Sequence, residues 1–115
     1  MKILKSLKLK IMISVQIDRI ALLIGVLEII KRECSNDDFK NKASMFLDKL
    51  FLCSLSGSIF FDLPKPLIKE ISKFFDEYIH VYGDYGCIGG KACDDAMINM
   101  LTDYEGNIIF NPHEN

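Results

Sequence analysis

The chain has 115 residues, half of them hydrophobic and about a quarter charged, which fits one globular helical domain over residues 1–115 and excludes an intrinsically disordered protein. Its net charge of −2 is unevenly distributed: the balance is +4 over residues 1–34, −1 over residues 35–82 and −5 over residues 83–115. Because an acidic final third repels nucleic acid and favours a cationic partner, we expect no nucleic-acid binding.

The four cysteines are too few for a disulfide scaffold, and a chain of this length buries enough surface to fold without disulfides or metal. Cys34 and Cys53 lie within or at the end of helical patterns, where a free thiol packs as a small hydrophobic group. We therefore expect a cytoplasmic protein that needs no cofactor.

The N-terminal lysines precede an apolar stretch, Ile11–Ile30, that is long enough for a membrane span. Asp18 and Arg19 lie near its middle, where each charge costs about 2.5–3.5 kcal/mol on insertion scales. A basic start could still touch an anionic surface, but a buried core helix is the preferred interpretation, and we expect no membrane insertion.

Apolar side chains alternate over residues 7–17, which is the period of a half-buried strand. Residues 7–15 are therefore either a strand or an extra helical turn, and residues 1–11 are either flexible or part of that short strand. A strand needs a partner, and the two candidate segments are residues 58–61 and 107–110.

Helical periodicity predicts a first helix over residues 16–33 that is apolar on nearly all sides, which places it at the centre of the fold. Ser35, with Asp38 three residues later, resembles a capping box and predicts the start of a second helix. The apolar stripe of this second helix comprises Phe39, Ala43, Phe46, Leu47, Leu50 and Phe51. A serine-rich segment, residues 54–58, ends it.

Pro64 and Pro66 mark the start of a third helix, Lys65–Tyr82, because proline suits the first turn of a helix, and Gly83 fits its C-terminal end. The remaining segments are a shorter fourth helix, a turn and a polar tail, at residues 91–101, 103–107 and 111–115. The predicted fold is mainly α: a compact bundle of about four helices, antiparallel where loops are short, with one or two short β-strands near the termini.

The segment "YGDYGCIGGKACDD", residues 82–95, raises the question of a phosphate-binding loop because it contains four glycines and a lysine. Such a loop needs four residues between its first glycine and the Gly-Lys pair, followed by Ser or Thr. Here three residues separate Gly86 from Gly90, Ala92 replaces the hydroxyl, and three aspartates would repel a phosphate. The pattern argues against phosphate binding.

A zinc site would use Cys87 and Cys93 with the two histidines, His80 and His113, but the spacing matches no common ligand pattern. A redox pair is also disfavoured because five residues, not two, separate the cysteines. Ordinary thiols and histidines are the preferred interpretation, and a small zinc- or thiol-dependent factor stays a third hypothesis.

Hydrolytic chemistry finds no support in the sequence. A Gly-x-Ser-x-Gly nucleophile motif is absent, and Asp94 and Asp95 are adjacent, so on a helix they point in different directions. We therefore expect a protein without catalytic activity.

Tyrosines interleaved with acidic residues indicate a surface for a protein partner, because charge speeds the encounter and aromatic side chains resist dissociation. A simple solvated loop is the competing interpretation. The predicted partner-binding residues are Tyr82, Asp84, Tyr85, Asp94, Asp95, Asp103, Tyr104 and Glu105.

In its size, its helical body and the segments "YGDYGCIGGKACDD" and "TDYEG", the chain resembles the small immunity proteins of bacterial contact-dependent growth inhibition and colicin-type toxin systems. The resemblance implies an antitoxin that binds a cognate toxin, a basic nuclease domain, and blocks its substrate site without catalysis. The alternative is a structural or regulatory helical module that self-associates through its apolar first helix, so both a monomer and a homodimer stay open.

Overall fold

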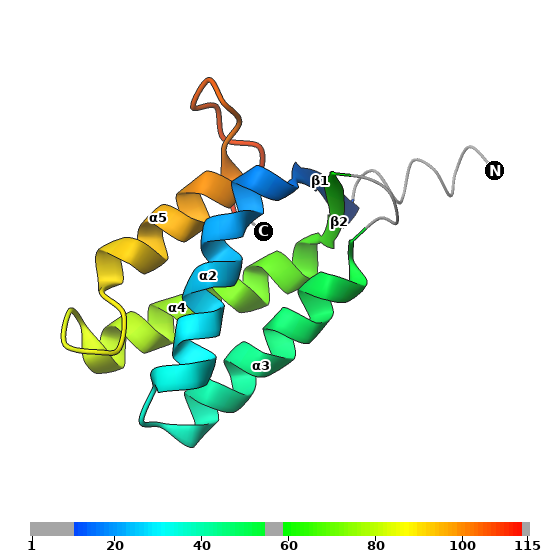
Figure 1. Ribbon diagram of the computed structural model, residues 1–115. Coiled ribbons are helices and arrows are strands. Elements are labelled where there is room, and N and C mark those ends of the chain that lie inside the picture. Colours follow the sequence, from blue (N-terminus) through cyan, green and yellow to red (C-terminus); the bar gives the residue numbers. More distant parts are fainter. Residues whose placement is uncertain (1–10, 55–58, 114–115) are drawn as a thin grey trace.

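The computed structural model describes residues 11–54 and 59–113. This part of the chain forms four helices and a two-stranded sheet, which confirms the predicted mainly α bundle (Figure 1). The elements in chain order are β1 (Met12–Gln16), α2 (Ile17–Glu33), α3 (Asp37–Leu52), β2 (Phe60–Pro64), α4 (Lys65–Tyr82) and α5 (Gly90–Leu101). The predictions for residues 1–10, 55–58 and 114–115 lie outside the described residues.

The helices form two antiparallel hairpins, as expected for short connections (Figure 1). α2 turns back into α3 through three residues, and α4 turns back into α5 through the glycine-rich loop. α2 contacts both α3 and α5, so it joins the two hairpins.

The sequence predicts α2 at the centre of the fold, and the structure buries one side of this helix only. Its inward side buries five apolar side chains, whereas Ala21, Leu22 and Gly25 on the opposite side are exposed. The helix is therefore covered on its core-facing side and open to solvent on the other.

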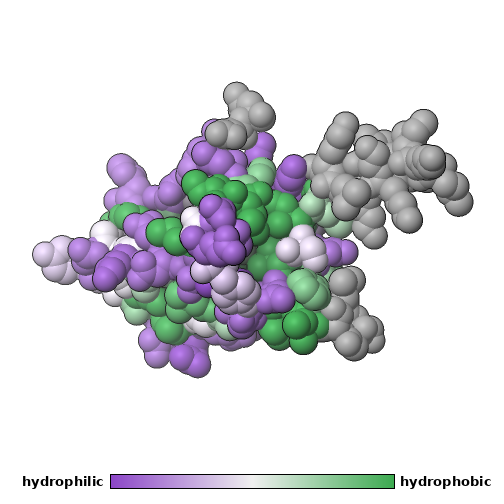
Figure 2. Space-filling model, turned by 90° about the horizontal axis from the view of Figure 1, so that it is seen from above, coloured by the Kyte–Doolittle hydropathy of each residue, from purple (hydrophilic) through white to green (hydrophobic). Residues whose placement is uncertain are grey.

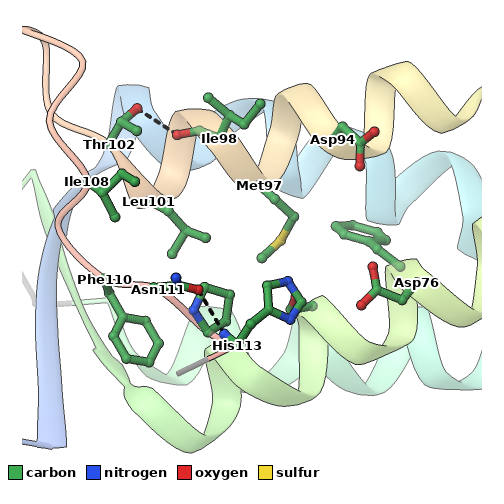
Figure 3. Close-up of a pocket in the computed structure, with 13 residues that line it drawn as sticks. Asp76, Asp94, Met97, Ile98, Leu101, Thr102, Ile108, Phe110, Asn111 and His113 are labelled. Carbon is green, nitrogen blue, oxygen red and sulfur yellow. Dashed lines mark hydrogen bonds between the residues drawn. The ribbon is translucent and has the colours of Figure 1, made fainter. Parts of the chain in front are cut away.

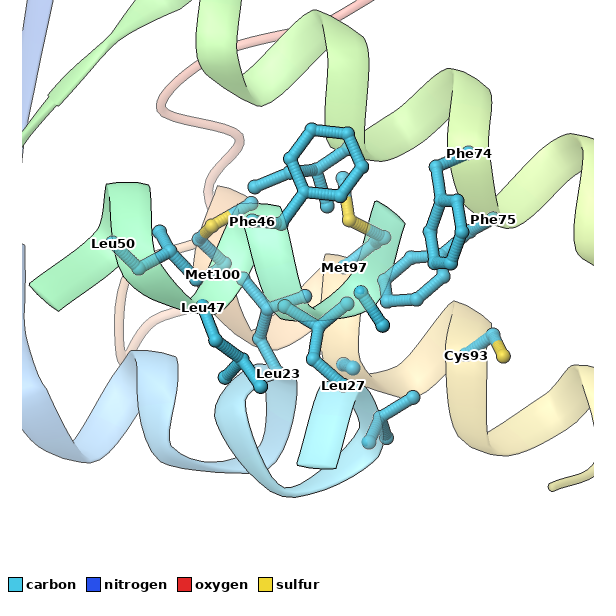
Figure 4. Close-up of a cluster of buried hydrophobic side chains, with 14 of the residues drawn as sticks. Leu23, Leu27, Phe46, Leu47, Leu50, Phe74, Phe75, Cys93, Met97 and Met100 are labelled. Carbon is cyan, nitrogen blue, oxygen red and sulfur yellow. The ribbon is translucent and has the colours of Figure 1, made fainter. Parts of the chain in front are cut away.

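The hydrophobic core takes side chains from all four helices (Figure 4). Leu23 of α2, Phe46 of α3 and Phe75 of α4 are almost fully buried, and burying such a side chain contributes about 1.5–3 kcal/mol. The predicted stripe of α3 is confirmed at five positions and wrong at Phe51, which is 53% exposed. Phe51 follows Leu50 directly, so the helical turn of about 100° per residue takes it off the buried face.

The sheet pairs β1 with β2 in antiparallel register, with Val15 opposite Phe61. The partner thus overlaps the first predicted segment, 58–61, at Phe60 and Phe61. The second candidate segment makes only an isolated bridge, between Ile108 and Thr102. β2 also lies in the middle of the chain, so the predicted location near the termini is correct for β1 and wrong for β2.

Proline and glycine define α4 as the sequence predicts. The helix starts directly after Pro64, and Gly83 ends it with a φ of 57° while its N–H donates to the Ile79 carbonyl. The predicted cap of α3 is wrong by one residue: Asn36, not Ser35, accepts hydrogen bonds from the backbone of Asp38 and Phe39. Serine and asparagine are about equally good helix caps, so the sequence alone does not choose between neighbours.

Across residues 11–54 and 59–113, no helix combines the length and the apolar character that crossing a membrane requires.

Candidate functional site

The glycine-rich loop between α4 and α5 is organised by one buried phenol. Tyr78 is fully buried, and its hydroxyl donates to the Ile88 carbonyl and accepts from the Ile88 N–H, both at 3.1 Å. The same hydroxyl lies 3.3 Å from the sulfur of Cys87. Burial raises the pKa of Tyr78 well above its ordinary value, so the phenol stays neutral and can donate.

Glycine lets the backbone of this loop lie close to the Tyr78 side chain, which accounts for glycine at Gly86 without a phosphate ligand. A Cβ at Gly86 would lie 2.2 Å from the Tyr78 hydroxyl oxygen, so only glycine fits there. The Asp84 carboxylate accepts a hydrogen bond from the N–H of Gly90 at 3.3 Å and so holds the loop to the start of α5. Packing against Tyr78 and hydrogen bonds to Tyr78 and Asp84 explain the loop geometry without a bound phosphate.

Four of the predicted partner-binding residues lie in the loop before α5 or in the first half of that helix, and we name them the α5 acidic surface: Asp84, Tyr85, Asp94 and Asp95. All four are exposed, and Tyr85 is 98% exposed. No residue in the described part of the chain forms an ion pair with these three aspartates. Two carboxylates of α4, Glu70 and Glu77, are instead paired with lysines of α3.

The Asp103 side chain organises the loop that follows α5, and the Tyr104 side chain attaches this loop to the start of α2. The Asp103 carboxylate accepts from the N–H groups of Glu105 and Asn107 at 2.9 Å, and the Asn107 bond is the main reason that the pKa of Asp103 is lowered. The Tyr104 hydroxyl donates to Gln16 and to Asp18. These side chains therefore make internal contacts.

The single docking patch expected from the sequence is thus divided in two. Asp95 precedes the end of α5 at Leu101 by six residues, a rise of about 9 Å. Asp103, Tyr104 and Glu105 follow the end of α5, whereas the α5 acidic surface occupies the loop before the helix and its first half (Figure 1). Glu105 is exposed but belongs to the far group.

Tyr82, a predicted partner-binding residue, packs against the hydrophobic core. Its ring is half-buried and packs against Phe39 and Tyr78, with ring centroids 5.7 and 5.0 Å away, and its hydroxyl accepts from the Cys34 thiol at 3.8 Å. Tyr82 follows Tyr78 by four residues, so both lie on the buried face of α4.

The residues considered for a zinc or thiol site have different surroundings. Cys93 is fully buried, and its burial raises the pKa of the thiol to about 12. Cys87 contacts Tyr78, and His80 is exposed on α4. Among the residues that the structure describes, no three His, Cys, Asp or Glu side chains are grouped as metal ligands.

A groove that the sequence did not predict lies between α4, α5 and the C-terminal segment, residues 108–113 (Figure 3). Its volume is about 370 Å³. Apolar side chains, among them Leu101 and Phe110, line one end, and the carboxylates of Asp76 and Asp94 approach the other end from opposite walls. We name this feature the α4–α5 groove.

Exposed hydrophobic side chains occur beside the α4–α5 groove, near β2 and along α2. The α4–α5 groove has an apolar rim, because Ile98 is 57% and Ile108 is 70% exposed. Seen from above, the molecule gathers hydrophobic residues at the centre of its face and borders them with hydrophilic ones (Figure 2). Ile98 was the one hint of this groove in the sequence, because it is a large apolar residue outside the buried stripe of α5.

Comparison with family models, curated proteins and solved structures finds no match to this chain. Function is therefore inferred from the surface charge, the exposed side chains and the α4–α5 groove.

Proposed function

We propose that this is a non-catalytic, cytoplasmic binding protein that captures a basic protein partner, as an immunity protein captures its toxin. The observation that carries the proposal is the α5 acidic surface, whose three aspartates have no ion-pair partner in the described part of the chain. The partner is a toxin domain of nuclease type, whose own substrate site is basic because it binds phosphates.

The α5 acidic surface suits such capture for two reasons. Unpaired carboxylates attract a cationic partner over about 8–10 Å at physiological ionic strength, which raises the association rate. Tyr85 adds a large, fully accessible aromatic side chain, the type that most often anchors an interface.

A binding role fits the chemistry of this region better than catalysis does. Cys93, the nucleophile nearest to the aspartates in sequence, is buried, and burial raises the pKa of its thiol to about 12. Asp94 lines the α4–α5 groove and Asp95 does not, so these neighbours do not act on one substrate atom as an acid–base pair.

The test starts from the gene immediately upstream, which we expect to encode a toxin domain, and uses that domain as the candidate partner. The double variant Asp94→Lys/Asp95→Lys should associate at least about tenfold more slowly than the wild type. The control, Glu33→Lys/Asp48→Lys, changes the net charge equally at exposed sites on α2 and α3 and should associate like the wild type. Equal binding by both double variants would contradict the proposal.

A second candidate function is self-association through the open side of α2. Ile17 and Leu22 on this helix are 48% and 40% exposed, and a Cβ at Gly25 would meet nothing within 4 Å. A second copy could cover this side. Sedimentation of the wild type and of Leu22→Glu tests it, because a dimer that dissociates in the variant supports self-association and a monomeric wild type excludes it.

A further inference from the structure

We propose that the α4–α5 groove holds an amphipathic segment of the protein partner, in which apolar side chains are followed at one end by a lysine or arginine. This inference rests on the proposed function and names the part of the partner that is recognised. It is carried by the arrangement of apolar and acidic side chains along the groove (Figure 3).

The length and width of the groove suit a short piece of polypeptide. Asp94 and Leu101 are seven residues apart on α5, so the groove is about 10 Å long, or two turns of a helix. Its volume of about 370 Å³ lies near the lower limit of typical ligand sites. Two apolar side chains from successive turns of a partner helix would fill this space.

The acidic end of the groove specifies the charge of the occupant. Asp76 on α4 and Asp94 on α5 are exposed, face the groove from opposite walls, and pair with no cation among the described residues. His113 is the one ionisable nitrogen base among the lining side chains. A lysine or arginine between the two carboxylates would relieve their mutual repulsion and fix the direction of the bound segment.

The open rim favours a polypeptide over a small molecule. Small ligands usually lose about 70–90% of their surface to an enclosing pocket. Here Ile98 and Ile108 are more than half exposed at the rim, so an occupant must also cover side chains that stand outside the groove. A helix laid across the rim buries these side chains and the groove in one step.

A model peptide tests the groove without the native partner. The probe is a fluorescently labelled peptide of leucine and lysine, about four helical turns long, with its leucines on one face. Fluorescence anisotropy should show binding to the wild type, at least about tenfold weaker binding to Ile98→Glu, and about threefold weaker binding to Asp94→Asn. The matched controls, Met45→Glu and Asp48→Asn, are exposed sites on α3 and should bind like the wild type.

Several outcomes would overturn the proposal. These are absence of peptide binding, equal binding by Ile98→Glu and Met45→Glu, or equal binding of a peptide in which glutamate replaces lysine. A homodimer that Ile98→Glu dissociates would assign the groove to a second copy instead. If Asp94→Lys/Asp95→Lys alone lost the toxin domain while Ile98→Glu kept it, the acidic surface would stand and the groove proposal would fail.

Discussion

At the residue scale, two polar side chains, those of Tyr78 and Asp103, have structural roles. Tyr78 satisfies both backbone groups of Ile88 from inside the core, and Asp103 organises the turn after α5. In each case one polar side chain replaces the regular backbone hydrogen bonds that an irregular segment lacks. Removing either group should therefore loosen a loop and leave the helices intact.

Replacing Tyr78 with phenylalanine should destabilise the protein by about 1–3 kcal/mol, because the N–H and C=O of Ile88 lose their partner while the ring still fills its site. Thermal or urea unfolding measures the change. Tyr85→Phe is the matched control, since its hydroxyl is in solvent, and it should unfold like the wild type. Equal stability of the two variants would exclude the structural role of Tyr78.

Replacing Asp103 with alanine should change how stability depends on pH. Hydrogen bonds from the Asn107 backbone lower the pKa of Asp103 in the folded state from its ordinary value of 3.8. The carboxylate therefore stabilises the fold above the unfolded-state pKa, and this contribution is lost as pH falls through the folded-state pKa. Unfolding curves should show Asp103→Ala less stable than the wild type at neutral pH and converging with it in acid; Glu105→Ala should follow the wild type throughout.

At the element scale, the sequence predicts helices well where proline, glycine and apolar periodicity agree. α4 begins after Pro64 and ends at Gly83 because each residue fixes a backbone angle that its position requires. The choice of Asn36 over Ser35 and the pairing of β1 with residues 60–64 were less accessible, because both depend on how separate segments meet.

The end of α5 is attached to the start of α2 by Arg19. Its guanidinium donates to the carbonyl and the hydroxyl of Thr102 at 3.2 and 3.0 Å and lies 5.1 Å from the centroid of the Tyr104 ring. Arg19→Met keeps the apolar stem and should cost about 1–3 kcal/mol, read from unfolding curves. The exposed Arg32→Met should cost almost nothing, and a matching loss there would contradict a specific role for Arg19.

At the scale of the whole molecule, charge is divided between two sides. Two ion pairs join α3 to α4, whereas the aspartates around the start of α5 have no ion-pair partner among the described residues. The acidic character of the final third was readable from composition, but its separation into two groups was not, since it depends on the contacts that hold the loop after α5 against the start of α2. The α4–α5 groove was inaccessible for the same reason: Asp76, Asp94 and residues 108–113 meet only after folding.

The unpaired aspartates of the α5 acidic surface predict how binding of the toxin domain responds to salt. The association rate of the wild type with the toxin domain should fall as ionic strength rises, because the Debye length shortens from about 10 Å at 0.1 M to about 3 Å at 1 M. Asp94→Lys/Asp95→Lys should show a much weaker dependence in stopped-flow measurements. A wild-type rate that is insensitive to salt would indicate that the aspartates do not guide the encounter.

The link between Arg19 and Thr102 spans 83 positions of the chain, which has a consequence during synthesis. A ribosome adds about 5–20 residues per second, so the newly made α2 waits roughly 4–17 s for the residues that complete its surroundings. During that interval the apolar side of α2 that α5 will cover is open to other nascent chains. The synthesis of α5 therefore completes the cover of α2 and ends the period in which this apolar side can start aggregation.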